Sequence, residues 1–384
     1  MRSSLSSSLV AAINDSRPVC GLSHTLYKYP ARFSPLFVRE VISSMTSPGE
    51  VVLDPFVGGG TSLVEAIAAG RDGIGLDINE LAIFVAKAKS TVYSDAELAR
   101  VSRYMDALTK VTLRGGVQDD EIARGRYYLN MDQHHLWRVR DFLAVCLTRV
   151  DQLESRIEKN LARCILLRTG QWALDCRKEM PTVRQFREQL RLQTKEATFG
   201  AKELRDTVKS TGRNPRTLCV RRSAVGSELD ERVKQFGRPS LVITSPPYPG
   251  VHVLYHRWQV QGRRETAAPY WIANLKDGHG ASFYTFADRS RIDLAVYLKM
   301  AEQAFTSVRQ LVSKGTPLVQ MVAFARPETQ LAPYLEMLRA AGWNEMTYPN
   351  SESRLWRAVP GRKWYTGLVQ SRANRELVLF HSAS

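Results

Sequence analysis

Cysteine is scarce in this chain of 384 residues, with five in all and no CxxC pair. An odd number of cysteines without metal-ligand spacing argues against a disulfide framework and predicts no metal site, so we expect a reducing, cytoplasmic compartment. No apolar run approaches the ~18 residues of a membrane span, and we predict no membrane segment. The apolar stretch before Asp15 is too short for a signal peptide.

Acidic residues are also in short supply. The chain has 38 acidic and 54 basic residues, a net charge of +16. Residues 1–150 carry a net charge of +1, whereas 151–240 carry +8 and 241–384 carry +7. This excess is typical of proteins that bind a polyanion, most simply nucleic acid, although a basic protein without such a partner fits it equally.

Strand and helix patterns alternate in two separate parts of the chain. Apolar strands are predicted at 51–54 and 72–78, each followed by a helix, and further strands at 217–220, 239–244, 316–325 and 375–382. This order predicts a doubly wound, Rossmann-like α/β sheet. Residues 95–215 have helical spacing and many charges, which predicts a helical insertion between the parts at 21–94 and 216–384. The Ser-rich first twenty residues are expected to be frayed.

A glycine-rich loop joins the first predicted strand to its helix. It reads Asp54-Pro55-Phe56-Val57-Gly58-Gly59-Gly60-Thr61, and glycines there let the backbone turn tightly and approach a ligand closely. Asp77 closes the next strand, where a carboxylate can accept hydrogen bonds from both ribose hydroxyls of an adenosine-type cofactor. Ile78 can pack on the adenine. The loop lacks the GK[ST] of a phosphate-binding loop and the third glycine of a nicotinamide fingerprint.

A second motif, Thr244-Ser245-Pro246-Pro247-Tyr248, follows a predicted strand. Consecutive prolines have fixed φ angles and no N–H donors, so the backbone presents carbonyl acceptors that suit an amine. Tyr248 can stack on a base, and the Ser245 hydroxyl can accept from or donate to a base edge. Taken alone, such a motif is usually only a turn.

Together these motifs are recognisable. DPFVGGGTSLVEA, GIGLDINELAIFVAKAK and SPPY resemble an AdoMet-dependent amino DNA methyltransferase. The resemblance implies that Asp54, Phe56, Gly58, Gly60, Thr61, Asp77 and Ile78 bind S-adenosyl-L-methionine, and that Ser245, Pro246, Pro247 and Tyr248 hold the target base. HTLYKYPARFSP resembles the segment that packs by the methionine end of the cofactor, which adds Tyr29, Pro30 and Phe33, with Lys28 near the cofactor carboxylate.

The resemblance implies direct methyl transfer to the exocyclic amine of a flipped base in duplex DNA. The serine form of the motif is commoner among N4-cytosine enzymes, which favours cytosine N4 over adenine N6. C5-cytosine chemistry needs an activated thiolate, usually in a Pro-Cys pair, and no cysteine here follows a proline. Alternatives are an RNA methyltransferase and a non-catalytic module that binds nucleic acid.

The sequence departs from the family in two places. The cofactor motif precedes the catalytic motif, whereas many SPPY enzymes have the reverse order. Relatives often carry a Gly-Asp pair near residue 221, with the acid on the adenine amine, and this chain has Arg221-Arg222-Ser223-Ala224 instead. Ser223 is therefore a candidate for the adenine contact.

Several basic segments are candidates for DNA contact. The first is the helical insertion, with Arg163, Arg168, Arg177, Lys178, Arg184 and Arg187; the others supply Arg257, Arg263, Arg264, Arg362 and Lys363. The alternative for each basic residue of the insertion is a place on a solvated helix face. The resemblance also implies a prokaryotic, nucleoid-associated protein with a possible cognate restriction endonuclease.

Overall fold

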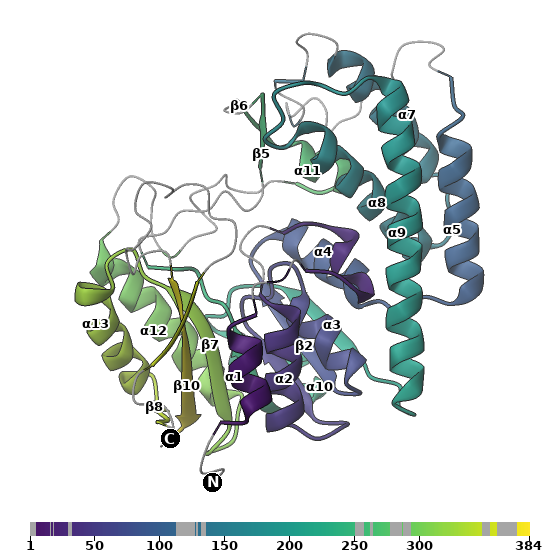
Figure 1. Ribbon diagram of the computed structural model, residues 1–384. Helices are drawn as coiled ribbons and strands as arrows, with labels where there is room; N and C mark the ends of the chain where they lie inside the picture. Colours follow the sequence, from purple (N-terminus) through teal and green to yellow (C-terminus); the bar gives the residue numbers. More distant parts are fainter. Residues whose placement is uncertain are drawn as a thin grey trace.

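The computed structural model describes residues 5–15, 17, 19–29, 33–112, 127, 130–131, 136–249, 257–261, 264–276, 286, 293–347, 354–358 and 375–384. These residues form two lobes, a sheet covered by helices and a mainly helical lobe (Figure 1). In this part of the chain, no helix is long and apolar enough to cross a membrane.

The large sheet confirms the predicted α/β fold. Its strand order is β3 (Thr217–Arg221), β2 (Asp72–Asp77), β1 (Val51–Asp54), β4 (Pro239–Thr244), β7 (Pro317–Ala323), β10 (Arg375–Ala383) and β8 (Trp343–Glu345), with β9 (Leu355–Ala358) also paired to β10. The strands from β3 to β7 are parallel to their neighbours, and β10 runs antiparallel to β7, β8 and β9. The chain first builds outward from β1 through β2 to β3 and then continues on the other side of β1. The strand order therefore reverses between β1 and β4.

Helices cover both faces of this sheet, because successive strand residues point to opposite sides. Val52 and Ile243 join a core with α1 (Ser7–Ile13) and α2 (Pro35–Met45), whereas Leu53 and Val242 join a core with α12 (Leu294–Gln310) and α13 (Pro327–Ala340). The other helices of the sheet lobe are α3 (Thr61–Ala68), α4 (Glu80–Ser90) and α10 (Glu231–Phe236), with short 3₁₀ turns η1 (Leu22–Leu26) and η2 (Ser227–Leu229).

The expectation that the first twenty residues are frayed is wrong for α1. The Ser6 side chain accepts a hydrogen bond from the Leu9 N–H at 3.2 Å, which caps the helix. Leu9, Ala12 and Ile13 are spaced to share one helix face and are buried, and Leu9 and Ile13 join the core with α2. The high serine content of this segment led to the expectation of a frayed end, although its apolar residues have amphipathic helical spacing.

The helical lobe contains α5 (Asp95–Leu108), α7 (Leu136–Val150), α8 (Arg156–Leu174) and α9 (Val183–Ser210). It also includes residues that follow SPPY in the sequence: the hairpin of β5 (Trp258–Val260) and β6 (Arg264–Thr266), and α11 (Ala268–Ala273). Trp258 is 2% exposed and lies against Gly170 of α8, so close that a Cβ on this glycine would come within 3.0 Å of the indole. Two segments far apart in sequence thus form one core.

Polar contacts join this lobe to the sheet lobe near the carboxyl end of β2. The Asn79 side chain caps α4 and also donates to the Tyr270 hydroxyl on α11. The Trp258 indole donates to the Tyr27 hydroxyl at 3.2 Å. These bonds tie the helical lobe to segments near the carboxyl ends of the parallel strands, and α9 also packs along the sheet lobe against η1 and α3 (Figure 1).

Candidate active site

The two sequence motifs meet where the strand order reverses. β1 ends at Asp54 and the parallel neighbour β4 ends at Thr244. The Thr244 hydroxyl donates to Asp54 Oδ1 at 2.7 Å, across 190 residues of sequence. In open α/β sheets, ligands bind outside the carboxyl ends of the strands at such a reversal. The glycine-rich loop and SPPY therefore leave the sheet side by side, at the place where this fold binds ligands.

Asp54 is a buried carboxylate that ties three segments together. Its Oδ1 accepts from the Phe56 N–H at 3.1 Å as well as from Thr244, and its Oδ2 accepts from the Ser62 hydroxyl of α3 at 2.5 Å. Burial raises the pKa of Asp54 to about 6, although these hydrogen bonds oppose the shift. In the described contacts, the carboxylate stabilises the scaffold and joins the cofactor motif to the strand before SPPY.

The glycine-rich loop is held against the end of β2 and covered by Tyr29. The Val57 N–H donates to the Leu76 carbonyl at 2.9 Å, and the Gly58 N–H donates to Asp77 Oδ2 at 3.0 Å. A Cβ on Gly59 would lie 2.7 Å from Cβ of Tyr29, and one on Gly58 would lie 3.1 Å from its ring. The loop needs glycine here because Tyr29 packs so closely upon it.

Gly60 sits at the start of α3 for two physical reasons. Its φ is +77°, and an added Cβ would lie 2.8 Å from the backbone Cα of Ala86 on α4. Gly60 also has no side chain to cap the helix, so the first N–H groups of α3 lack a side-chain cap. These N–H groups point toward the loop and suit an anionic group. Thr61, the first helical residue, is buried.

We expect Gly60→Ala to destabilise the protein more than Gly315→Ala. Gly315 has φ +82° and open space around its would-be Cβ. Both variants incur the left-handed penalty of about 1–2 kcal/mol. Gly60→Ala alone also incurs overpacking against α4, a further about 1–3 kcal/mol. Melting temperatures of both variants and wild type test this. Equal losses would show that the close approach of α3 and α4 is not what requires glycine.

Asp77 is a partly exposed carboxylate at the end of β2. Its Oδ2 accepts from Gly58 and its Oδ1 accepts from the Asn79 N–H at 2.9 Å. Burial raises the pKa of Asp77 to about 6, against the effect of these backbone hydrogen bonds, and the nearby Asp54 charge adds to the rise. Each carboxylate oxygen retains a lone pair for a further donor. Ile78, next in the chain, is also partly exposed.

The SPPY motif forms a short chain of hydrogen bonds that ends on β10. The Ser245 hydroxyl donates to the Tyr248 hydroxyl at 3.0 Å, and Tyr248 donates to Glu376 Oε1 at 2.8 Å. The Pro247 carbonyl accepts from the Tyr297 hydroxyl of α12 at 2.7 Å. Tyr248 is 5% exposed. Glu376 and Tyr297 are functional candidates that sequence reasoning missed, because no motif surrounds either residue.

Phe56 extends from the glycine-rich loop toward α12. Its ring lies edge-on to Phe286 and Phe305, with centroid distances of 5.4 and 6.1 Å. Phe33 is buried under α2, with the Phe33 and Phe37 rings 5.9 Å apart. Lys28 is exposed, and its backbone pairs with the Gln171 side chain of α8. Pro30 lies outside the described residues.

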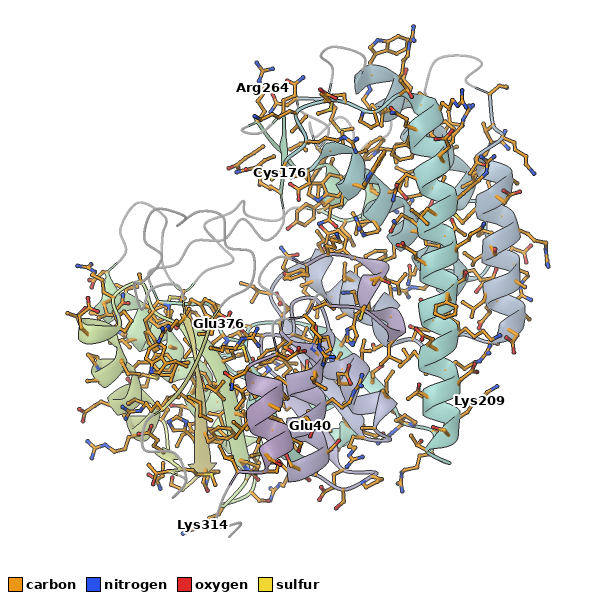
Figure 2. The ribbon with its side chains drawn as sticks, in the orientation of Figure 1. Glu40, Cys176, Lys209, Arg264, Lys314 and Glu376 are labelled. Atoms are coloured by element: carbon orange, nitrogen blue, oxygen red, sulfur yellow. The ribbon has the colours of Figure 1, made fainter. Side chains whose placement is uncertain are left out.

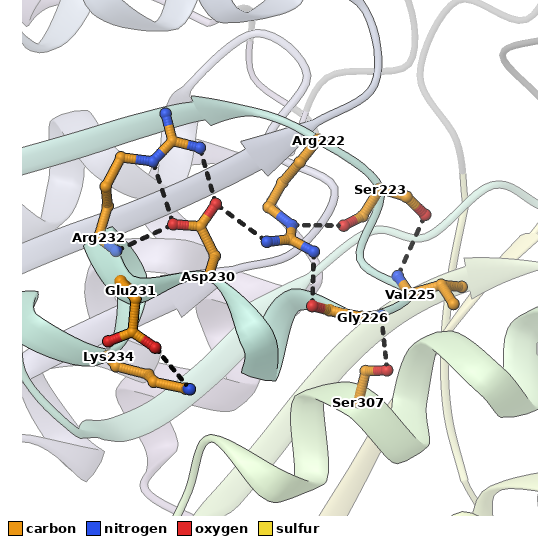
Figure 3. Close-up of polar contacts among 9 residues, drawn as sticks. All are labelled: Arg222, Ser223, Val225, Gly226, Asp230, Glu231, Arg232, Lys234 and Ser307. Carbon is orange, nitrogen blue, oxygen red and sulfur yellow. Dashed lines mark hydrogen bonds and ion pairs between the residues drawn. The ribbon is translucent and has the colours of Figure 1, made fainter.

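The loop after β3 is held by an arginine and an aspartate (Figure 3). Arg222 contacts Asp230 at 2.9 Å and donates to the Gly226 carbonyl at 2.5 Å, while the Gly226 N–H donates to Ser307. The guanidinium groups of Arg232 and Arg222 lower the pKa of Asp230. Ser223 is exposed in this loop, and its Oγ accepts from the Val225 N–H at 3.1 Å. Because the Ser223 oxygen is the acceptor in that contact, the hydroxyl hydrogen is not used there and can donate to another group.

The candidate DNA-contacting residues are only partly described. Arg264 is exposed on β6 and Arg257 is partly exposed just before β5, both beside the helical lobe (Figure 2 labels Arg264). Arg263, Arg362 and Lys363 lie outside the described residues. The basic hairpin therefore extends from the same lobe that the insertion forms.

Two of the helical arginines that the sequence offered for phosphate contact have structural roles instead. Arg163 is 4% exposed, donates to the Ile272 carbonyl at 2.7 Å and pairs with Asp151. Arg187 donates to the Val111 carbonyl at 2.6 Å, and its guanidinium lies over the Phe142 ring. Helical periodicity could not reveal these buried partners. Arg184, in contrast, has 89% of its side chain exposed.

Comparison with known proteins finds a family match for the first part of the chain. Residues 13–88 match the DNA methylase family (N6_N4_Mtase). The match contains α2, the glycine-rich loop, Asp77 and most of α4. It confirms that this part of the chain resembles amino DNA methyltransferases.

Three characterised relatives support the same family. The type II methyltransferase M.MvaI of Kocuria varians is 39% identical over 82 residues, which are 21% of this chain and 18% of that protein. M.MjaII of Methanocaldococcus jannaschii is 28% identical over 102 residues, 26% of this chain and 19% of that one. The DNA adenine methyltransferase YhdJ of Escherichia coli is 36% identical over 78 residues, 20% of this chain and 26% of that one. The chain thus spans about a fifth to a quarter of the length of these relatives.

Among solved structures, the rRNA methyltransferase AviRa of Streptomyces viridochromogenes aligns with 94% of this chain and 90% of its own. The identity is 9% and the TM-score is 0.38. The assignment of the fold therefore rests on the strand order observed here.

Proposed function

We propose that this protein is an AdoMet-dependent DNA methyltransferase that acts on an exocyclic amine, with cytosine N4 favoured. The observation that carries the proposal is the hydrogen bond between Thr244 and Asp54. It joins the glycine-rich loop and SPPY at the reversal of strand order, where a cofactor and a base have to meet for direct transfer. The family match of residues 13–88 supports the chemistry of the cofactor half.

The groups around the glycine-rich loop fit S-adenosyl-L-methionine. Asp77 offers lone pairs for the ribose hydroxyls, and Ile78 beside it offers apolar surface for the adenine. The N–H groups at the start of α3, which lack a side-chain cap, suit the carboxylate of the methionine part. Gly58, Gly60, Thr61, Phe56 and Tyr29 complete the proposed cofactor site, and Asp54 holds the loop in place.

When bound, AdoMet supplies an electrophilic methyl group on a sulfonium. The protein's part is to orient the attacking amine and stabilise the positive charge that develops on it. We assign this part to the Ser245 hydroxyl and to the carbonyl groups of Pro246 and Pro247, which all present oxygen acceptors. We propose that Tyr248 forms a wall of the base pocket. Because Tyr248 is only 5% exposed, the groups that cover its ring have to move before a base can stack on it.

Ser245 is the reason to favour cytosine N4, since the serine form of the motif is commoner in that class. Adenine N6 is the second candidate, because YhdJ, which is 36% identical over 78 residues, is a DNA adenine methyltransferase. Two other relatives are named type II methyltransferases, which supports a role in restriction–modification alongside a cognate endonuclease.

We further propose that the helical lobe reads the DNA. It is anchored beside the carboxyl ends of the strands, and its hairpin presents Arg264. The segments 151–240 and 241–384, which include α8, α9 and the hairpin of this lobe, carry net charges of +8 and +7 out of +16. Arg257 and Arg263 of the hairpin region, and Arg362 and Lys363 nearer the C-terminus, are the proposed basic contacts.

Product analysis tests the proposed function. The purified protein is incubated with labelled AdoMet and unmethylated genomic DNA, the DNA is digested to nucleosides, and the labelled nucleoside is identified by mass. N4-methylcytosine is the expected product. N6-methyladenine would retain the enzyme class and overturn the choice of base. Methyl transfer to RNA but not to DNA would mean that RNA is the substrate. Methyl transfer to neither would favour a module that binds nucleic acid without catalysis.

A further inference from the structure

Glu376 is the end point of the hydrogen-bond chain that starts at Ser245. It lies on β10, 128 residues after Tyr248, and accepts from the Tyr248 hydroxyl at 2.8 Å. Glu376 and Tyr248 are 6% and 5% exposed, so the contact is shielded from water. Figure 2 labels Glu376 on the sheet lobe, toward the end of the sheet that faces the helical lobe. A buried, charged acceptor at this place requires an explanation.

The carboxylate gives the chain of hydrogen bonds a direction. An ionised carboxylate can only accept, so the Tyr248 hydrogen is committed to Glu376. The Tyr248 oxygen then accepts from Ser245, whose own hydrogen is committed in turn. A serine hydroxyl can otherwise act as donor or acceptor. In this arrangement the Ser245 oxygen can only accept a hydrogen bond, and an incoming amine needs such an acceptor for its N–H.

Arg357 keeps the carboxylate in this role. Its Nε lies 3.5 Å from Glu376 Oε2, and both side chains are buried. The guanidinium supplies the positive partner that a buried carboxylate requires. It also sits on the oxygen that Tyr248 does not use. One oxygen of Glu376 thus accepts a hydrogen bond from Tyr248, and the other faces the Arg357 guanidinium at ion-pair distance.

We propose that Glu376 is a positioning residue that sets Ser245 as a hydrogen-bond acceptor toward the target amine. This inference rests on the proposed methyltransferase function. Glu376 acts through Tyr248 and Ser245 and does not touch the substrate. The carboxylate thereby allows a serine to present a fixed acceptor where a bare hydroxyl would be free to turn its hydrogen toward the amine.

Glu376→Gln reverses the direction of the chain. Its amide oxygen pairs with Arg357, which only donates, so its NH₂ group faces Tyr248. Tyr248 then accepts from the amide and donates to Ser245, whose hydrogen turns outward against the amine. We expect the single-turnover rate of methyl transfer to fall about ten- to hundredfold. The Kd for AdoMet and for DNA should stay within about twofold of wild type, since neither ligand is bound by Glu376.

Tyr248→Phe separates this effect from a general loss of structure. It cuts the chain but leaves Ser245 free to turn, so the rate should fall less, about three- to tenfold. In the Tyr248→Phe background, Glu376→Gln should cause no further loss of rate. Tyr93→Phe is the matched control. It removes a buried hydroxyl that donates to the Ala88 carbonyl outside the site, and its rate should equal that of wild type.

The outcomes distinguish this inference from the proposed function. A wild type that transfers no methyl to DNA overturns both. An active wild type with Glu376→Gln at the wild-type rate overturns the inference alone, as does an additive loss in the double variant. If Glu376→Gln fails to bind AdoMet because the fold is lost, Tyr248→Phe carries the test by itself, and an unchanged rate in that variant overturns the inference.

Discussion

Asp77→Asn is expected to weaken AdoMet binding by about ten- to hundredfold, as loss of hydrogen bonds to a charged acceptor costs about 1.5–3 kcal/mol. The carboxylate presents only acceptors, whereas the amide of asparagine would place donors among the Gly58 and Asn79 N–H groups that Asp77 now accepts. Isothermal titration at pH 7.5 measures the effect. A Kd like that of wild type would remove Asp77 from the cofactor site.

The same residue predicts how cofactor binding depends on pH. Burial raises the pKa of Asp77 to about 6, and only the ionised carboxylate accepts from two ribose hydroxyls without displacing a proton. AdoMet binding thus favours the deprotonated protein. Affinity should be constant above about pH 7 and fall as the pH drops through 6, by up to about tenfold per pH unit below that.

Asp77→Asn should remove that pH dependence. A variant that still loses affinity below pH 6 would point to Asp54, because burial raises its pKa to about 6 as well. Asp54 titrates inside the scaffold, and burial raises its pKa in the folded protein above the ordinary value, so the folded state takes up the proton first. Its protonation would therefore also show as a rise in melting temperature as the pH falls through about 6. Measuring AdoMet affinity and melting temperature over the same pH series therefore separates the protonation of Asp77 from that of Asp54.

Ser245→Ala is expected to reduce methyl transfer by about 100- to 1000-fold, the usual loss when one preorganised polar group is removed from a reacting centre. AdoMet binding should stay within about twofold of wild type, because Ser245 belongs to the loop after β4 and the cofactor site lies mainly after β1 and β2. The measurement is a single-turnover rate with labelled AdoMet, beside a cofactor Kd.

Ser210→Ala is the matched control, since this hydroxyl only bonds the Thr207 carbonyl at the end of α9. It should transfer methyl groups at the wild-type rate. Loss of cofactor binding in Ser245→Ala would mean that the loop after β4 also shapes the cofactor site. A wild-type rate in this variant would remove the serine from the chemistry and weaken the preference for cytosine.

Local pattern predicted much of the sheet lobe because its signals are short-range. The strand expected at 239–244 is β4, and those expected at 51–54 and 375–382 are β1 and most of β10. Glycine before a helix and an acid at a strand end are readable without knowing any neighbour. Helix α13 begins at Pro327, because proline is well tolerated in the first helical turn.

Long-range packing decided the parts that pattern could not predict. The hairpin at 258–266 and α11 follow SPPY in sequence, yet they complete the core of a lobe built mostly from residues 95–210. Their apolar residues have no partner nearby in the chain, so no local rule assigns them to that lobe. The structural contacts of the buried Arg163 and the partly buried Arg187 were missed for the same reason.

The sequence by itself determined the two motifs, their residues and the kind of chemistry they suit, because glycine, proline and acidic residues constrain the backbone wherever they stand. Only the tertiary structure decided that the motifs lie side by side, through the parallel pairing of β1 with β4 and the bond from Thr244 to Asp54. It alone placed Glu376 behind Tyr248. Hydrogen bonds across 190 and 128 residues depend on strand order, which no local signal in the chain records.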